Sequence, residues 1–302
     1  MATSIKPSEP VVYTVGRSKK FSIGNIVSKT AIYLVLGFWS LVVVFPMLWS
    51  VLTSLKTDQE IFFSPWAMPK ILMFENFARA WVKARMGAYL INTLLIIIPA
   101  LFFTLLLSSM AAYVLARYEF RGRTFLTYLF MLGMIFPIFL ALVPLYFVMR
   151  TLGLLDTFPG MILVYIAFSL SFTIFFLTNF FRTLPSELGE AALMDGADHY
   201  DIFFRIYLPL AQPGLVTMFI FNFLGQWNQY ILPNTLMITN NDTTTHYVLS
   251  QGLYYLQAQQ FYQNDWSGLF AAVTIVMIPT LAVYLIFNDR IEKGMTAGAI
   301  KG

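Results

Sequence analysis

Long apolar stretches are the feature that most restricts this chain. Six of them occur, at about 31–52, 89–115, 125–148, 161–181, 214–234 and 268–288. An α-helix of about 20 apolar residues crosses the roughly 30 Å of hydrocarbon in a bilayer. A soluble core does not need several stretches of that length. The pattern therefore predicts an all-α, polytopic membrane protein with about six transmembrane helices.

Composition supports the same class. Charged residues make up 11% of the chain, whereas a soluble domain carries about 25%. Aromatic residues make up 17%, and Trp and Tyr commonly belt a bilayer at its interfaces. The chain has no Cys and only two His, which argues against a thiolate or His-rich metal site. We expect no cofactor on this chain, and its modest positive charge is no sign of nucleic-acid binding.

The distribution of Lys and Arg predicts which side the loops face. With the N-terminus inside, the inner segments carry 13 Lys and Arg and the outer loops carry six. Cytoplasmic loops carry the excess of such residues, so we expect both termini in the cytoplasm. Residues 1–30 are polar and basic, and they are interpreted as a cytoplasmic tail that precedes a membrane domain at 31–302.

The apolar stretches carry almost no charge at their centres. Proton relays and voltage sensors need ionisable side chains inside the membrane, so a self-powered, ion-coupled transporter is disfavoured. A transporter of this composition would take its energy from outside the membrane.

The segment at 184–210, between the fourth and fifth stretches, predicts two short helices. Ser186 is a suitable N-cap for the first, and Gly196 is a natural residue at its C-terminal end. Asp198 can cap the second helix, and Pro209 is expected to stop it.

The second helix is amphipathic. Its predicted apolar face, spaced at i, i+3, i+4, i+7 and i+8, consists of Tyr200, Phe203, Phe204, Tyr207 and Leu208. Two interpretations are open: the segment docks onto another protein, or it rests on lipid. Acidic residues outnumber the two nearby arginines, and anionic lipid would repel such a segment. The balance therefore favours contact with a protein.

The spacing of several residues in this segment resembles the EAA loop of bacterial ABC importer permeases. In that family the loop forms a coupling helix, which docks into a groove of a nucleotide-binding subunit. The matching positions are Glu190-Ala191-Ala192, Gly196, Ile206 and Leu208-Pro209. The resemblance implies that the coupling residues are Glu190, Ala191, Ala192, Asp195, Gly196, Ile206, Leu208 and Pro209.

The end of the chain resembles the maltose-type (MalG-like) branch of carbohydrate permeases. Asp265-Trp266 and the tail Lys293–Gly302 carry the likeness, with Met295 and Ile300 as mild departures from the usual tail. In that branch the tail, here 289–302, reaches between the two ATPase subunits. The resemblance covers roughly 75–302 and places the permease core at about 75–290.

The resemblance also implies partners. The sequence contains no Gly-x-x-x-x-Gly-Lys-Ser/Thr phosphate loop, so ATP and Mg²⁺ would bind to separate subunits. We expect two copies of a nucleotide-binding ATPase, a second homologous permease and an extracytoplasmic sugar-binding protein. The chain would be a multi-pass subunit of a bacterial or archaeal inner membrane, surrounded by lipid, and would itself catalyse no reaction.

The fifth stretch ends in polar and aromatic residues of the kind that bind sugars, which stack on aromatic rings and hydrogen-bond to amides. These residues are Asn222, Gln226, Trp227, Asn228 and Tyr230. Polar amides in a span face the bundle or a cavity rather than lipid. Two interpretations are open here: a lining of the sugar pathway, or hydrogen bonding between helices.

The last outer loop is rich in Gln and aromatic residues. The resemblance implies that it probes the sugar-binding protein through Tyr254, Tyr255, Gln257, Gln260 and Tyr262. An ordinary interfacial aromatic girdle is the alternative.

Other functions remain as alternatives. Permeases for glycerol-3-phosphate or another polyol share this type of tail. A membrane enzyme, such as a lipid-modifying transferase, would need clustered acids, His or Lys near the interface, and the stretches offer no such cluster.

Overall fold

The computed structural model describes the backbone of residues 23–237 and 246–299. Within these ranges, the side chains of 23–27, 260–263 and 289–299 are not described. Every regular element in the described residues is a helix, which confirms the predicted all-α class. The chain divides into two units between Trp49 and Ser50, and all elements from α2 onward lie in the second unit.

The helices follow one another with short connections. In chain order they are α1 (Ile23–Thr53), α2 (Asp58–Phe63), α3 (Glu75–Ala78), η1 (Arg79–Lys83), α4 (Met86–Arg117), α5 (Arg123–Ile135), α6 (Ile138–Thr151), α7 (Phe158–Thr183), α8 (Glu187–Met194), α9 (His199–Asp201), η2 (Ile202–Tyr207), α10 (Leu208–Leu210), α11 (Gln212–Trp227), α12 (Ile231–Leu236), α13 (Leu249–Gln263) and α14 (Trp266–Ala299). The elements η1 and η2 are π-helices, in which the hydrogen bonds run from i to i+5.

Four of the predicted spans are confirmed as single helices. Within the described residues, the helices long and apolar enough to cross a membrane are Ser28–Thr53, Met86–Arg117, Phe158–Thr183 and Trp266–Asn288. The number rises to six if each of two bent helix pairs is counted as one span. The last of these helices continues as α14 to Ala299, so it includes most of the predicted tail at 289–302. Residues 300–302 lie outside the described residues, as do residues 1–22 of the predicted N-terminal tail.

The third predicted span, 125–148, is not one straight helix. It consists of α5 and α6, which meet at an angle of 103°. The break lies at Phe136 and Pro137, both of which have extended backbone conformations. A proline lacks the backbone N–H and disfavours a helical conformation in the residue before it, which explains why α5 ends there. In contrast, Pro144 lies inside α6.

The fifth predicted span, 214–234, is also shorter than expected. Its helix, α11, ends at Trp227, and a separate helix, α12, follows. At its other end α11 is bent by 71° from the helical segment His199–Leu210. The long hydrophobic stretch therefore contains two helix boundaries that its apolar composition does not reveal.

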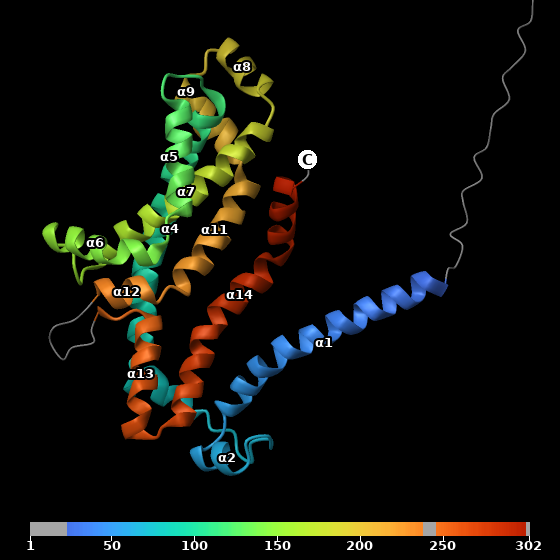
Figure 1. The fold of residues 1–302 in the computed structure, drawn as a ribbon, viewed down its shortest axis with the longest axis vertical. Coiled ribbons are helices and arrows are strands. Elements are labelled where there is room, and N and C mark those ends of the chain that lie inside the picture. The colour runs from blue at the N-terminus through green and yellow to red at the C-terminus, as the bar shows by residue number, and fades with distance from the viewer. Residues whose placement is uncertain (1–22, 238–245, 300–302) are drawn as a thin grey trace, which may run out of the picture. The chain divides into compact units, whose positions relative to one another are not determined.

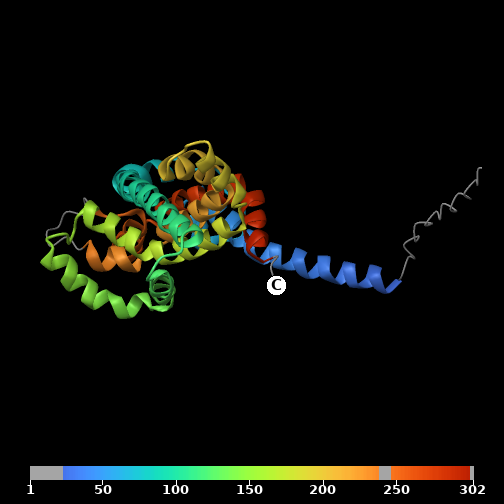
Figure 2. The same cartoon turned by 90° about the horizontal axis from the view of Figure 1, so that it is seen from above.

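The second unit is a bundle in which α4 and α7 pack along their lengths and α11 and α14 complete the central group. Helices α8 and α9 lie at one end of this bundle, and α2 lies at the other (Figure 1). Viewed from the α8 end, α5 and α6 lie on the outside of the bundle (Figure 2). We refer below to the α8 end and the α2 end.

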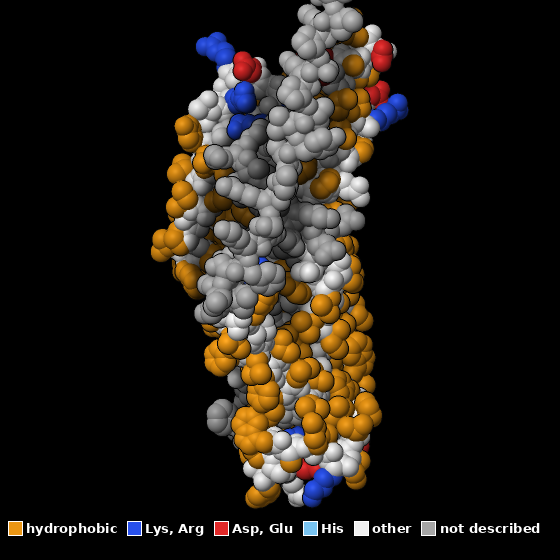
Figure 3. Space-filling view, turned by 90° about the vertical axis from the view of Figure 1, so that its right-hand side faces the viewer, with side chains coloured by type: hydrophobic (Ala, Val, Ile, Leu, Met, Phe, Trp, Pro, Cys, Tyr) orange, Lys and Arg blue, Asp and Glu red, His pale blue; other side chains and the backbone are white. Residues whose placement is uncertain are grey.

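Apolar side chains face both inward and outward on the long helices. On α4, Ile96 and Ile97 are buried in the core, whereas Leu95 and Ile98 are exposed. Hydrophobic side chains cover most of the described surface in the lower part of the face drawn in Figure 3, and most of the visible Lys, Arg, Asp and Glu lie near its ends. This distribution is the one a bilayer requires.

Helix α13 approaches α4 so closely that only glycine fits at the contact. A Cβ added at Gly252 would overlap the ring of Tyr89, which is 2% exposed. We expect Gly252→Ala to lower stability by about 1–3 kcal/mol, the usual cost of overpacking. Thermal unfolding of the purified protein in detergent measures the effect.

Gly225 provides the matched control for this substitution. It lies within α11, and no heavy atom lies within 4 Å of the position a Cβ would take. Gly225→Ala should leave stability unchanged or raise it by up to about 1 kcal/mol, because alanine favours helices. Equal effects of the two substitutions would contradict the close contact between α13 and α4.

Candidate functional site

The predicted helix–turn–helix is present at the α8 end. Gly196 has φ = +86°, and its N–H donates to the carbonyl of Leu193 at 3.1 Å, so it closes α8 as expected. The carboxylate of Asp198 accepts a hydrogen bond from the N–H of Asp201 at 2.7 Å and caps α9. The predicted cap at Ser186 is wrong in its chemistry. Ser186 precedes α8, but its backbone is already helical and its side chain makes no capping hydrogen bond.

The residues of the predicted apolar face of the second helix differ in burial. Phe203 and Tyr207 are buried, but Tyr200 is 72% exposed and Phe204 is 44% exposed. The π-helix η2 has more residues per turn than an α-helix, so the buried stripe shifts and includes Ile202 instead. The helix also continues past Pro209 as α10 and turns only at Ala211, so the predicted stop at Pro209 is wrong.

Most of the predicted coupling residues lie on the surface. Glu190, Ala191, Asp195 and Gly196 are exposed on α8 and the turn after it, and Pro209 is exposed on α10. The remaining three are half-buried, namely Ala192, Ile206 and Leu208. Two of these, Ala192 and Leu208, pack against the buried cluster at this end of the bundle. The segment therefore has one face toward the bundle and another toward the surroundings.

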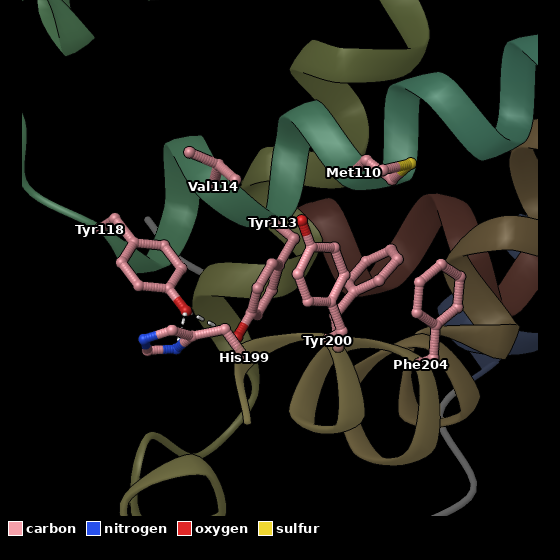
Figure 4. A pocket seen from close by; sticks show the side chains of 8 residues that line it. Met110, Tyr113, Val114, Tyr118, His199, Tyr200 and Phe204 are labelled. Atoms are coloured by element: carbon pink, nitrogen blue, oxygen red, sulfur yellow. Dashed lines mark hydrogen bonds between the residues drawn. The ribbon is translucent and has the colours of Figure 1, made fainter. Parts of the chain in front are cut away.

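Aromatic side chains hold the inner face of the segment against α4. The ring of Tyr113 lies 5.1 Å from that of Phe203, 5.3 Å from that of Tyr207 and 5.9 Å from that of Phe181. Tyr118 and Nδ1 of His199 share a hydrogen bond of 2.9 Å (Figure 4). These contacts join the end of α4 to α7, α9 and η2.

An open hollow of about 500 Å³ lies between α4 and the second helix of the segment, and Tyr113, Tyr118 and Phe203 are among the residues that line it. The labelled side chains in Figure 4 include Met110, Tyr200 and Phe204, which lie along this hollow. Tyr200 and Phe204 lie beside this opening, which explains why these two members of the apolar face are exposed.

Arg117 has a structural role that the sequence did not reveal. Arg117 is the last residue of α4, and its guanidinium donates hydrogen bonds to the carbonyls of Phe181 and Leu184 at 2.8 and 2.7 Å. Sequence reasoning counted it only as one of the inner positive charges. A cation in the last turn of a helix is a weak signal, because its partners lie on segments more than 60 residues away.

The polar residues of α11 make hydrogen bonds to neighbouring helices. Nδ2 of Asn222 donates to the hydroxyl of Thr173 at 2.9 Å, and Nε2 of Gln226 donates to the hydroxyl of Ser169 at 3.0 Å. Both acceptors lie on α7, and we call these two contacts the polar seam. Oε1 of Gln226 is buried and has no hydrogen-bond partner in the described residues. The other pathway candidates lie nearby: the indole of Trp227 donates to the carbonyl of Val276, the amide of Asn228 bonds within α11, and Tyr230 is half-buried.

The stretch predicted to be the last outer loop forms α13. Tyr254, Tyr255 and Gln257 are exposed on this helix, and the ring of Tyr254 lies 5.1 Å from that of Tyr230. The side chains of the other two docking candidates, Gln260 and Tyr262, lie outside the described residues. Three of the predicted residues therefore share an accessible helix.

Polar contacts join distant segments at the α2 end. Arg79 forms an ion pair with Asp265 at 3.0 Å, and Asp58 accepts a hydrogen bond from the backbone of Ser267 at 2.7 Å. The Lys56 side chain is 2% exposed and donates to the carbonyl of Pro65 at 2.6 Å. The backbone N–H groups of Thr57 and Lys70 donate to the Glu60 carboxylate and hold its pKa below the usual value. Sequence reasoning used Lys56, Lys70 and Arg79 only for charge counting and did not predict these contacts.

The described residues offer no cluster of three or more His, Cys, Asp or Glu side chains that could hold a metal ion. The fold and site define a polytopic helical membrane protein with an exposed helix–turn–helix at one end of its bundle. Residues 104–297 match the family of the binding-protein-dependent transport system inner membrane component, and the chain belongs to that family.

Relatives of this chain are permease proteins. It is 45% identical over 263 residues to the diacetylchitobiose uptake system permease protein NgcG of Streptomyces coelicolor, which covers 87% of this chain and 86% of that one. It is 34% identical over 257 residues to the trehalose transport system permease protein SugB of Mycobacterium tuberculosis, which covers 85% and 92%.

One solved structure shares the fold. A chain in the crystal structure of a bacterial ABC transporter involved in the import of the acidic polysaccharide alginate superposes with a TM-score of 0.77 and 21% identity. The superposition covers 90% of this chain and 99% of that one, which supports the fold over nearly its whole length.

The polar seam predicts a measurable coupling between α7 and α11. A double-mutant cycle of Asn222→Ala and Thr173→Ala should give a coupling energy of about 0.6 kcal/mol, and at most about 1.7, as for other hydrogen bonds within membranes. Equilibrium unfolding in detergent measures the four variants. A coupling energy of zero would contradict the hydrogen bond between these two side chains.

Proposed function

We propose that this chain is one of two permease subunits of an ATP-driven, binding-protein-dependent carbohydrate importer. The chain forms half of the translocation pore and has no cofactor of its own. ATP and Mg²⁺ bind to two copies of a partner ATPase. The second permease and an extracytoplasmic sugar-binding protein complete the transporter. ATP-driven closure of the ATPases moves the coupling segment and switches the pore between inward- and outward-facing states.

The observation that carries this proposal is that one side of the coupling segment is exposed while its other side packs against the bundle. Glu190, Ala191 and Gly196 lie at the surface, where an ATPase groove can receive them. The other side of the segment packs against α4 and α7 through Tyr113, Phe203 and Tyr207. A docking element needs both properties, because a contact on its outer face must displace the helices on its inner face.

The excess of Lys and Arg in the inner segments supports a cytoplasmic position for the α8 end. Both termini then lie in the cytoplasm, and the α2 end faces outward in the inner membrane of a bacterium or archaeon. In this orientation the end of α14 lies on the same side as the ATPases. This position agrees with the role that the family resemblance implies for the tail.

The names of two relatives, the diacetylchitobiose and trehalose permease proteins, support a carbohydrate as cargo. We propose that the sugar passes beside the polar end of α11. There Gln226 keeps a buried carbonyl oxygen that has no partner among the described residues, and an amide group of this kind can bind a sugar hydroxyl. The polar seam holds the helix in place, so the helix-bonding and pathway interpretations are compatible for Gln226.

We further propose that α13 contacts the sugar-binding protein. Tyr254, Tyr255 and Gln257 are exposed on α13, and aromatic residues are enriched in protein interfaces. Because α13 packs on α4 and α14, pressure on its surface reaches two helices of the central group.

Gly196→Asp tests the docking of α8. A charged side chain at this exposed position should release the ATPase subunits from the purified complex and abolish transport. Co-purification of the ATPase with this chain in detergent, together with sugar uptake in proteoliposomes, measures the two effects. If the complex stays intact and transport persists, the docking role of this turn is wrong.

Gly122 provides a control for backbone strain and charge. Its φ is +98°, it precedes α5 rather than α8, and a Cβ there would meet open space. Gly122→Asp introduces the same carboxylate at a similarly left-handed position, which costs about 1–2 kcal/mol at most for such a residue. We expect this variant to keep its ATPases.

Reconstitution tests the function as a whole. Sugar-stimulated ATP hydrolysis should appear only when this chain, the second permease, the ATPase and the loaded binding protein are present together. The measurement is the rate of phosphate release in proteoliposomes, with each component omitted in turn. Full stimulation without this chain would exclude the proposed role.

A further inference from the structure

Arg117 binds the carbonyl groups at the end of a different helix. Its Nη2 atom donates to Phe181 and Leu184, at 2.8 and 2.7 Å, where α7 ends and the coupling segment begins. The last carbonyls of a helix lack partners within that helix, and a cation there also interacts favourably with the helix dipole. One guanidinium therefore connects the end of α4 to the end of α7.

The same guanidinium lies over an aromatic ring of the coupling segment. Its central carbon is 4.5 Å from the centroid of the Tyr207 ring, at a distance typical of cation–π contacts. Tyr207 is 2% exposed, and its hydroxyl donates to the carbonyl of Pro185 at 3.1 Å. Tyr207 therefore connects η2 to the turn that precedes α8.

Helix α8 rests directly on Tyr207. A Cβ added at Gly189, in the middle of α8, would come within 2.9 Å of the Tyr207 hydroxyl. Among the described helices, η2 is the main packing partner of α8. Beside this contact, a cavity of about 150 Å³ separates α8 from the end of α4, and its lining includes Arg117 and Glu190.

Several routes lead from α8 to the bundle, and Arg117 takes part in two of them. The covalent route runs through residues 184–186 to α7, and Arg117 binds the carbonyl of Leu184 on that route. The packing route runs through Tyr207, and Arg117 covers the face of its ring. The cavity lies between α8 and the end of α4, so these two contacts of Arg117 help to determine how a displacement of α8 is passed on.

We infer that Arg117 is the positioning residue that makes α8, the end of α7 and the end of α4 move together. The inference rests on the proposed function of α8 as the docking element of an ATPase. Without the guanidinium, α8 can shift into the neighbouring cavity while α4 and α7 stay in place. The transporter would then hydrolyse more ATP for each sugar that it transports. Its ATPases would remain bound, because the substitution leaves the outer face of α8 unchanged.

The test measures sugar transported per ATP hydrolysed in the full reconstituted complex with loaded binding protein. For Arg117→Met we expect the ATP used per sugar to rise about twofold to thirtyfold, the range that single residues in coupling networks produce. The ATPases should still co-purify with the complex. A loss of folded protein alone would lower transport and hydrolysis in the same proportion and leave this ratio unchanged.

Further variants separate the contacts of Arg117. Arg117→Lys keeps the charge and can reach the carbonyls, but it lacks the planar group over Tyr207, so its ratio should be intermediate. Tyr207→Leu should raise the ratio by removing the ring. Arg182→Met is the matched control, because Arg182 lies next to Phe181 but is exposed, and its ratio should equal that of the wild type.

A wild-type ratio for Arg117→Met, with the ATPases bound, would overturn the inference and leave the proposed function intact. If Arg117→Met fails to assemble, a wild-type ratio for both Arg117→Lys and Tyr207→Leu would overturn it as well. A failure of the proposed function gives a different result, because Gly196→Asp would then keep both its ATPases and its transport.

Discussion

Backbone hydrogen bonding in hydrocarbon is the constraint on which this structure depends. No water is available in the bilayer core, so each backbone N–H and C=O group needs a partner within the protein. Long helices such as α4 and α7 meet this need internally. The end of such a helix leaves carbonyl groups without partners, and these ends are where the chain needs side chains such as Arg117. The position of the coupling segment follows from how one such end is completed.

The two ends of the bundle are held in different ways. At the α2 end, polar contacts join segments far apart in the sequence, such as Arg79 with Asp265 and Asp58 with the backbone of Ser267. At the α8 end, the described contacts between distant segments include several between aromatic rings, together with those of the Arg117 guanidinium. Aromatic contacts tolerate small displacements better than hydrogen bonds, which need good distance and angle. The end proposed to meet the ATPases is thus the end better suited to movement.

Local signals in the sequence were sufficient for much of this architecture. The length of apolar stretches predicted four of the spans, and single residues such as Gly196 and Asp198 predicted the turn between α8 and α9 because their chemistry acts within a few residues. The misses have a common cause. The break at Pro137 and the π-helix η2 lie inside patterns that look regular, and whether a proline bends or ends a helix depends on neighbouring packing. The predicted apolar face is divided between core and surface, because Phe203 in η2 is buried whereas Tyr200 in α9 is exposed.

The docking residues of α8 can be recognised from the sequence more readily than the residues that attach α8 to the bundle. Glu190, Ala191 and Gly196 lie close together in the chain, so their spacing can be recognised without a structure. Arg117, Tyr207 and Leu184 come from three separate segments and meet only in the folded bundle. A surface that docks a partner can be compact in sequence, but the joint that passes a displacement onward must connect different helices. A motif search therefore finds where a partner binds, and only the folded structure identifies the residues that make the binding move the helices.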